Sequence, residues 1–308
     1  MKVFCGGSEH YINQIDRIRS GFIENGCELV SLEEADIIYF NDPHVYDLDA
    51  KNKNTNAKVI FNVLDLPPHC IDGSKYDISR YPYINGCRRD YNPEVLAAKL
   101  KKCDIATCIC EEVQWQLKNW CGVDSIVIYN PIKDVSFLNL NADESFKNDK
   151  GELYKYLYVG RANDPNKRFN IVYETMKILG DKPDSLAVIG SENPRWGDYY
   201  SVVKDDDLNL FYNSVEYLFF PSAFKSIGLP ALESVVTKTK TIVCNDDPTT
   251  NEFWQDIGVS SNPEEIAGCI KNTDWNLKVQ EFVNLKSEEY KIRFDKKTIA
   301  ANIISLIC

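Results

Sequence analysis

Short apolar runs alternate with helical patterns along this chain, and that alternation constrains its fold more than any other feature. The chain opens with a strand-like run at residues 2–5, turns at Gly6 and Gly7, and continues with apolar residues at helical spacing from Ile12 to Phe22. Further apolar runs rich in β-branched residues lie at 36–40, 59–65, 104–110 and 125–129. Because runs that are apolar on both faces are typical of parallel strands covered by helices, the first half predicts a parallel α/β sheet.

The second half repeats this pattern after a polar stretch without periodicity, and we place an interdomain linker in that stretch, near residues 132–150. Strand-like runs follow at 154–160, 185–190, 217–222 and 241–245. We therefore predict two doubly wound Rossmann-like α/β domains, residues 1–135 and 150–293, with the amphipathic segment 294–308 packing back on the first. Ligands bind at the carboxyl ends of such sheets, and a cleft between facing domains is the expected site.

The composition excludes several classes of protein. A chain of 308 residues suits two domains of about 100 to 150 residues each. It has no run of about 18 apolar residues and no signal-peptide pattern, so we expect no transmembrane segment and a cytoplasmic location. A net charge of −11 argues against a broad nucleic-acid surface. No GxGxxG motif follows a predicted strand, which disfavours a nicotinamide dehydrogenase.

The 11 cysteines indicate reduced thiols rather than a disulfide framework, because a chain of this size needs no covalent cross-links. The densest group, Cys103, Cys108, Cys110 and Cys121, leaves a zinc site as an alternative. Cys108 and Cys110 alternate within one strand-like run, and a free cysteine behaves as a small apolar side chain. We therefore expect these thiols in the core and no metal site.

Two cations flank the glycine turn that follows the first strand of the second half. That strand ends at Gly160, Arg161 follows directly, and Lys167 comes six residues later. A guanidinium fork and a lysine point charge on one loop are suited to neutralising a diphosphate without a metal ion. An ordinary solvated loop is the alternative, and Arg168 is a second candidate for the role given to Lys167.

A second anion site is predicted where a helix begins after residues 217–222. Gly228 permits close approach of the backbone, and Pro230 in the first turn sacrifices no hydrogen bond. The free amides and the dipole of a helix N-terminus favour an anion there. Glu233, one turn further on, is placed to accept hydrogen bonds from both ribose hydroxyls. The alternative is a well-formed helix start without a ligand.

Taken together, these segments resemble the glycosyltransferase family 4 pattern of retaining enzymes with the GT-B fold. The resemblance covers residues 158–179, where the family has its strand, Gly-Arg and lysine, and residues 207–224, where a short helix leads to a strand ending in Pro-Ser. It continues through Ile227-Gly228-Leu229-Pro230 to the second glutamate of the family at Glu233. In the first domain, residues 103–132 are similar to the strand, helix and strand that precede the linker of the family.

The resemblance implies a metal-independent glycosyltransferase that moves a hexose from a nucleotide-diphosphate sugar, UDP- or GDP-linked, to a hydroxyl of a glycan or small acceptor. It implies no cofactor and no metal ligand, and it makes Arg161 and Lys167 the catalytic residues that stabilise the departing diphosphate. The donor-binding residues that it implies are Gly6, Gly7, Gly160, Arg161, Lys167, Gly190, Ser222, Lys225, Ser226, Ile227, Gly228, Leu229 and Glu233.

The chain departs from the family at one position. The paired glutamates of the family lie eight residues apart, and the residue eight before Glu233 is Lys225. Since the first glutamate helps to hold the sugar, two alternatives remain open: a nucleotide-sugar-binding protein without turnover, and an enzyme with a changed donor sugar. A DNA-base glucosyltransferase like those of viruses is a further alternative, which the net charge disfavours.

Acceptor candidates lie in the first domain. Asp65 and His69 flank Pro67-Pro68 after a predicted strand, Arg88 lies in the long segment beyond, and His10 follows the glycine turn. A polar residue at the carboxyl edge of a sheet is positioned to contact a sugar. For each histidine the alternative is a structural or merely exposed side chain.

Overall fold

The structure is a computed structural model that describes residues 1–7, 12–41, 50–68, 71–79, 81, 92–201, 203–224, 227–254 and 256–307. The chain forms two compact units. Unit 1 comprises Met1–Ser79, Gly86–Pro131 and Ile292–Cys308, and unit 2 comprises Arg80–Asn85 and Ile132–Lys291. No helix in the described part of the chain is both long and apolar enough to span a membrane.

Unit 1 is built on a parallel sheet of six strands in the order β2-β1-β3-β4-β5-β6. All four residues of β3 are buried, as are five of the six in β4, which explains why these strands read as apolar runs. The strands are β1 Lys2–Gly6, β2 Glu28–Leu29, β3 Ile37–Phe40, β4 Lys58–Val63, β5 Ile105–Cys108 and β6 Ile126–Val127.

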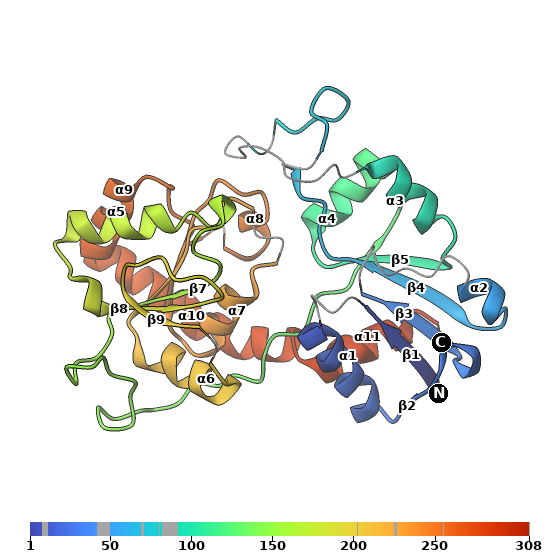
Figure 1. The fold of residues 1–308 in the computed structure, drawn as a ribbon, viewed down its shortest axis with the longest axis horizontal. Coiled ribbons are helices and arrows are strands. Elements are labelled where there is room, and N and C mark those ends of the chain that lie inside the picture. Colours follow the sequence, from blue (N-terminus) through green and yellow to red (C-terminus); the bar gives the residue numbers. More distant parts are fainter. Residues whose placement is uncertain are drawn as a thin grey trace. The chain divides into compact units, whose positions relative to one another are not determined.

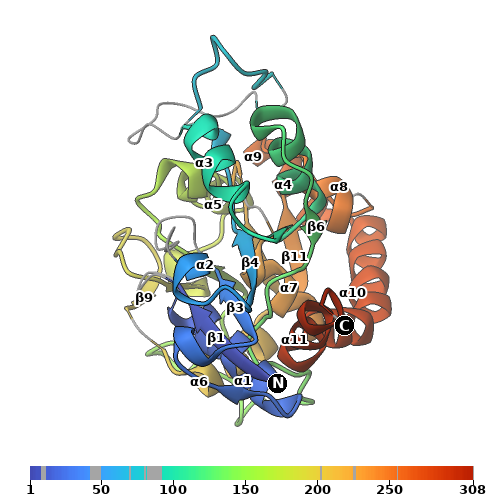
Figure 2. The same ribbon diagram turned by 90° about the vertical axis from the view of Figure 1, so that its right-hand side faces the viewer.

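Helices cover both faces of this sheet: Figure 1 shows α3 and α4 on one face and α1 with α11 on the other. Helix α11 comes from the end of the chain and lies beside α1 (Figure 2), where Gly21 of α1 leaves room for the backbone carbonyl of Lys296. The helices are α1 Ile12–Glu24, the 3-10 helix η2 Leu32–Glu34, α2 Ala50–Lys53, α3 Pro93–Leu100, α4 Glu111–Gln116, the π-helix η4 Leu117–Cys121 and α11 Lys296–Ser305.

Unit 2 contains a parallel sheet of five strands in the order β11-β10-β7-β8-β9. The four strands that the sequence predicts are present as β7, β8, β10 and β11, and the edge strand β9 is an addition whose three residues, Asp-Tyr-Tyr, are too few to show a strand pattern. The strands are β7 Tyr156–Val159, β8 Leu186–Ile189, β9 Asp198–Tyr200, β10 Tyr217–Phe220 and β11 Lys240–Val243.

Helices α5 and α9 lie together on one face of the second sheet, and α6 lies on the other (Figure 1). The α5 face buries aromatic side chains, among them Tyr158 of β7, which meets Phe169 of α5 edge to face with 4.9 Å between ring centroids. The helices are η5 Pro165–Lys167 and η6 Pro183–Ser185, both 3-10, with α5 Phe169–Leu179, α6 Asp205–Ser214, α7 Leu229–Val236, α8 Thr250–Phe253, α9 Pro263–Lys271 and α10 Thr273–Arg293.

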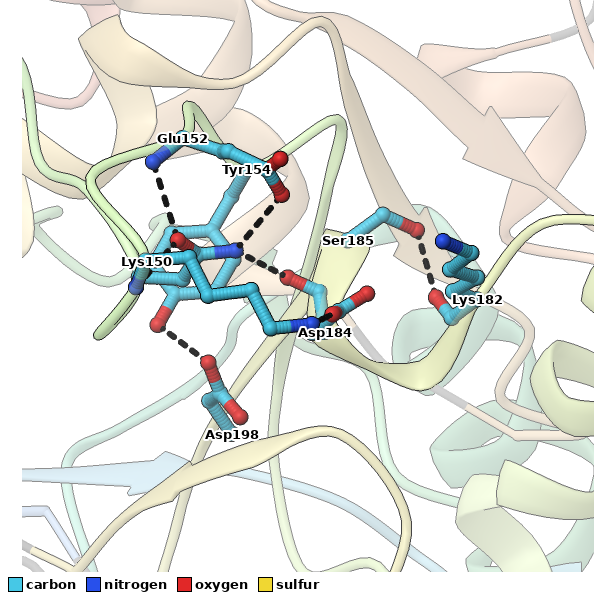
Figure 3. Close-up of polar contacts among 8 residues, drawn as sticks. Lys150, Glu152, Tyr154, Lys182, Asp184, Ser185 and Asp198 are labelled. Atoms are coloured by element: carbon cyan, nitrogen blue, oxygen red, sulfur yellow. Dashed lines mark hydrogen bonds and ion pairs between the residues drawn. The ribbon is translucent and has the colours of Figure 1, made fainter.

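Polar contacts fasten the segment before β7 to the amino-terminal edge of the second sheet (Figure 3). The Tyr154 hydroxyl donates to Asp198 Oδ2 at 2.8 Å, and Lys150 forms an ion pair with Asp184. The Asn148 side chain accepts hydrogen bonds from two backbone amides of its own turn and donates to the Asp184 carbonyl at 3.1 Å. These contacts join the segment before β7 to residues just before β8 and at the start of β9.

The cysteine-rich run of the first domain contributes to the core, as expected. Cys108 and Cys110 are fully buried, and the Ser125 hydroxyl lies 3.4 Å from Cys108 Sγ. Burial raises the pKa of the Cys121 thiol to about 12. Among the described residues, no three or more His, Cys, Asp or Glu side chains gather in a way that could hold a metal ion.

Candidate functional site

The carboxyl ends of β7, β8 and β10 meet at one edge of the second sheet, because neighbouring parallel strands run in the same direction. Residues 160–168 follow β7, residues 190–197 follow β8, and residues 221–228 follow β10. The described donor candidates of unit 2 lie in these loops, with the exception of Glu233 and Leu229 on α7. The site is built here from these three loops.

In the loop after β7, Asp164 organises Arg161. The Arg161 Nη2 atom lies 2.7 Å from Asp164 Oδ2, and the Arg161 side chain is 63% exposed, which leaves most of its fork open to a ligand. The other oxygen of Asp164 accepts from the Asn166 amide at 2.9 Å and caps η5. Burial raises the pKa of Asp164, but these hydrogen bonds outweigh burial and hold that pKa below its usual value.

The two candidate cations at the end of this loop have different surroundings. Arg168 has a left-handed backbone with φ of 50°, and its Nη1 lies 2.5 Å from Asp246 Oδ2 in an ion pair whose side chains are 11% and 6% exposed. Lys167 is half-buried, with Nζ 6.0 Å from the Phe220 ring centroid at the end of β10. Arg168 thus forms a buried ion pair, and Lys167 stays the candidate for binding an anion.

Gly160 and Gly190 are close neighbours at the ends of β7 and β8. A Cβ atom at Gly190 would lie 2.0 Å from the Gly160 carbonyl oxygen, so no side chain fits there. The Gly160 amide donates to the Ile189 carbonyl at 2.9 Å, which prolongs the strand pairing into the loop. These glycines let two loops approach each other with bare backbone at the site edge.

The loop after β10 leads into α7. Ser222 and Ile227 are buried, and Gly228 has φ of 69° at the N-cap, where no side chain caps the helix. The Gly228 carbonyl accepts from the amides of Ala231 and Leu232, so the helix is well formed although the first amides of any helix lack an internal partner. An uncapped N-terminus of this kind is suited to an anion. Lys225 and Ser226 lie outside the described residues.

Asn166 joins the two loops directly. Its side chain accepts from the Phe224 amide at 2.9 Å and donates to the Phe224 carbonyl at 2.9 Å, while its own carbonyl accepts from the Ala223 amide at 2.8 Å. Asn166 could not be found from the sequence, because its partner Phe224 lies 58 residues away and asparagine carries no local signal for such a contact. Asn166 thereby joins the loop of residues 160–168, the cation loop, to the loop that follows β10 and precedes α7.

Glu233 is 3% exposed and has structural partners of its own. Its Oε1 accepts from the Lys133 amide at 3.2 Å, and its Oε2 accepts from the Tyr212 hydroxyl at 2.9 Å. A carboxylate can accept about four hydrogen bonds, so these contacts are compatible with a ribose ligand. Its contact with ribose stays a prediction.

The candidates in unit 1 are placed only in part. Gly6 ends β1, and a Cβ at Gly7 would lie 2.0 Å from Ile15 Cδ1, so the packing of α1 accounts for glycine at this position. Asp65 is half-buried after β4. His10, His69 and Arg88 lie outside the described residues.

The sequence analysis did not find the buried polar chain at the carboxyl ends of β3, β4 and β5. Asn62 Nδ2 donates to Asn41 Oδ1 at 2.7 Å, and the Thr107 hydroxyl donates to Asn62 Oδ1 at 2.9 Å. All three residues are fully buried, and Asn41 Nδ2 has no hydrogen-bond partner among the described residues. Single polar residues within apolar strands gave no sequence signal of this alignment.

Comparison with the sequences of known proteins finds a distant similarity. No family model matches the chain. The O-antigen chain mannosyltransferase RfbU of Salmonella typhimurium is 23% identical over 220 residues, which is 65% of this chain and 59% of that protein. The chain therefore spans less than two thirds of the length of this relative.

Solved structures match over nearly the whole chain. The sucrose-phosphate synthase of Thermosynechococcus elongatus superposes with a TM-score of 0.63 at 14% identity, covering 97% of this chain and 78% of that one. AviGT4, a glycosyltransferase involved in avilamycin A biosynthesis, superposes with a TM-score of 0.61 at 11% identity, covering 99% and 96%. The fold is the GT-B fold, with two α/β units that each carry a parallel sheet.

Proposed function

We propose that the protein is a retaining, metal-independent glycosyltransferase of the family 4 type, which moves a hexose from a nucleotide-diphosphate sugar to a hydroxyl of a glycan. One observation carries the proposal: Arg161, Lys167 and the uncapped start of α7 belong to loops that meet at one edge of the second sheet and are joined by Asn166. Two cations and a helix N-terminus at one place suit a diphosphate.

In the proposed reaction, the bond between the anomeric carbon and the diphosphate oxygen breaks while the acceptor hydroxyl forms a bond on the same face. The hydroxyl proton passes to the departing phosphate. Negative charge grows on that phosphate as the bond lengthens, so Arg161 and Lys167 stabilise the transition state more than the bound donor. Positioning and charge stabilisation replace a protein nucleophile.

Two features bear on the substrates. The relative at 23% identity is named as a mannosyltransferase of the O-antigen chain, which supports a hexose donor, UDP- or GDP-linked, and a glycan acceptor. Lys225 stands where the family has a glutamate, and its ammonium can donate to sugar hydroxyls or pair with an acidic sugar. Lys225→Glu is then expected to shift donor preference toward neutral hexoses.

The test is a screen of UDP-, GDP-, ADP- and TDP-sugars for transfer, hydrolysis and thermal stabilisation of the protein. A donor at 100 times its dissociation constant adds about 2.7 kcal/mol to the free energy of unfolding, so binding is visible even without turnover. Turnover with retention supports the proposal. Binding without turnover favours a nucleotide-sugar-binding protein, and transfer to DNA bases alone favours a DNA glucosyltransferase.

A further inference from the structure

We infer that Asn166 is a positioning residue that locks the cation loop to the loop before α7, so that Lys167 and the helix N-terminus act on one diphosphate as a single rigid site. This inference rests on the proposed function. It adds a residue that neither the family resemblance nor the sequence motifs assign, and it gives that residue a kinetic role without any contact to the substrate.

The first argument is the geometry of the contact. The side-chain amide of Asn166 bonds to both the N–H and the C=O of Phe224, as a neighbouring strand would, and both distances are 2.9 Å. The Ala223 amide adds a third bond, 2.8 Å to the Asn166 carbonyl. Strands β7 and β10 are neighbours in the sheet, so this contact continues their pairing beyond the point where both strands end. Loops that diverge after their strands are thus held together.

The second argument is that Asn166 belongs to a continuous hydrogen-bond path. Arg161 donates to Asp164 Oδ2, and Asp164 Oδ1 accepts from the backbone amide of Asn166. The side chain of Asn166 in turn accepts from the Phe224 amide. One end of the path is an exposed guanidinium, and the other end immediately precedes Lys225. A displacement of either loop therefore disturbs the other.

The third argument concerns Lys167, which follows Asn166 directly at the end of η5. Its Nζ lies over the ring of Phe220, the last residue of β10, so the lysine leans toward the strand to which Asn166 fastens its loop. Without the Asn166 side chain, the bond from the Ala223 amide to the Asn166 carbonyl remains between the two loops. Misplacement of a catalytic group by about 1 Å can cost a factor of about 100 in rate.

A readout that needs no substrate tests the contact itself. In Asn166→Ala the Phe224 amide loses its acceptor, and its hydrogen exchange is expected to accelerate about 3- to 10-fold, the range for one ordinary hydrogen bond. The matched control is Asn148→Ala, which removes four side-chain hydrogen bonds near the amino-terminal ends of the strands of the same sheet. In that variant, exchange at Phe224 should stay as in the parent protein.

Kinetics test the role. Asn166→Ala is expected to lower kcat about 10- to 100-fold with less than about a threefold change in donor dissociation constant, whereas Asn148→Ala should change neither. If the role of Asn166 were merely structural, Asn166→Ala would lower the thermal stability and leave the kcat of the folded protein unchanged, as is expected for Asn148→Ala. Equal losses of kcat in the two variants, or a loss of donor affinity that matches the loss of kcat, would overturn the inference.

The isosteric variant Asn166→Asp adds a pH signature. Its carboxylate still accepts from the Phe224 amide, but its second oxygen repels the Phe224 carbonyl oxygen. Once the carboxyl group is protonated, it can donate to that carbonyl as the asparagine does. The ratio of variant to parent kcat should therefore rise as the pH falls from 8 to 5. Asp164 accepts from the Asn166 backbone amide, and Lys167 follows Asn166 in the chain. Both proteins share these charged groups, so the ratio of the two kcat values reports mainly on the introduced carboxyl group. A pH-independent ratio would contradict the inference.

The two levels of proposal fail in different ways. If the parent protein transfers and hydrolyses no nucleotide sugar, the proposed function fails and the role of Asn166 falls with it. If the parent protein is active and Asn166→Ala retains full kcat, the function stands and the inference alone is wrong.

Discussion

At the scale of single residues, the sharpest prediction concerns Arg161 and Lys167, because charge grows on the leaving phosphate only as the glycosidic bond breaks. Arg161→Ala and Lys167→Ala are each expected to lower kcat about 10- to 1000-fold, with smaller effects on donor dissociation constants. Steady-state kinetics combined with calorimetry of donor binding measures both quantities. The control is Lys182→Ala, an exposed lysine at the amino-terminal edge of the sheet.

Equal losses of kcat and affinity would make the two cations simple binding residues. Full activity in Lys167→Ala would favour Arg168, which forms an ion pair with Asp246, as the second cation at the diphosphate.

Glu233 is predicted to have both a structural and a binding role. Glu233→Gln replaces an oxygen that accepts a hydrogen bond, so the free energy of unfolding should fall by about 1.5 to 3 kcal/mol, measured by urea denaturation. Nucleotide affinity should fall as well, because a carboxylate binds two ribose hydroxyls better than an amide does.

Tyr212→Phe separates the two roles of Glu233, since it removes the bond from the tyrosine hydroxyl without touching a ribose. This variant should lose stability and keep nucleotide affinity. If both variants bind nucleotide as the parent protein does, Glu233 is structural only.

At the scale of elements, a close helix contact lies in unit 1, where α11 meets α1. A Cβ at Gly21 would lie 2.2 Å from the Lys296 carbonyl oxygen, so Gly21→Ala must push the two helices apart. Thermal denaturation should show a loss of about 1 to 3 kcal/mol, as for other overpacked contacts. The two helices contribute side chains to one hydrophobic core of the unit, among them Ile18 of α1 and Ile299 of α11.

The matched control is Gly268→Ala on α9, where an added Cβ meets nothing within 4 Å. Alanine there should stabilise the protein by about 0.5 to 1 kcal/mol, because glycine within a helix loses more conformational entropy on folding. Opposite shifts in melting temperature for two glycine-to-alanine changes are the expected result. A neutral Gly21→Ala would show that α11 does not pack as described.

At the scale of the whole molecule, the prediction is that activity survives chelation. Arg161 and Lys167 take the place of a divalent ion at the diphosphate, so turnover in excess EDTA should equal turnover without it. Assays after dialysis against EDTA, with and without added magnesium or manganese, measure this. Loss of turnover that either metal restores would show that the diphosphate is held in another way.

Much of the fold followed from local patterns. The buried strands β3, β8 and β10 read as apolar runs, and α7 was anticipated from Gly228 and Pro230, because strand burial and helix starts leave marks within a few consecutive residues. The edge strand β9 was missed, since its three residues, Asp-Tyr-Tyr, are too few to form a pattern. The choice between Lys167 and Arg168 could not be made from their adjacency.

The sequence by itself determined the alternation of strands and helices, the parallel sheets of both halves, and the loops that carry the candidate cations. Only the tertiary structure decided that Arg168 pairs with Asp246, that Asn166 joins residues 58 positions away, and that Glu233 accepts from Lys133 and Tyr212. The physical reason is range. Periodicity and turn chemistry act between neighbours in the chain, whereas the partner of a polar side chain is chosen by packing that brings distant segments together.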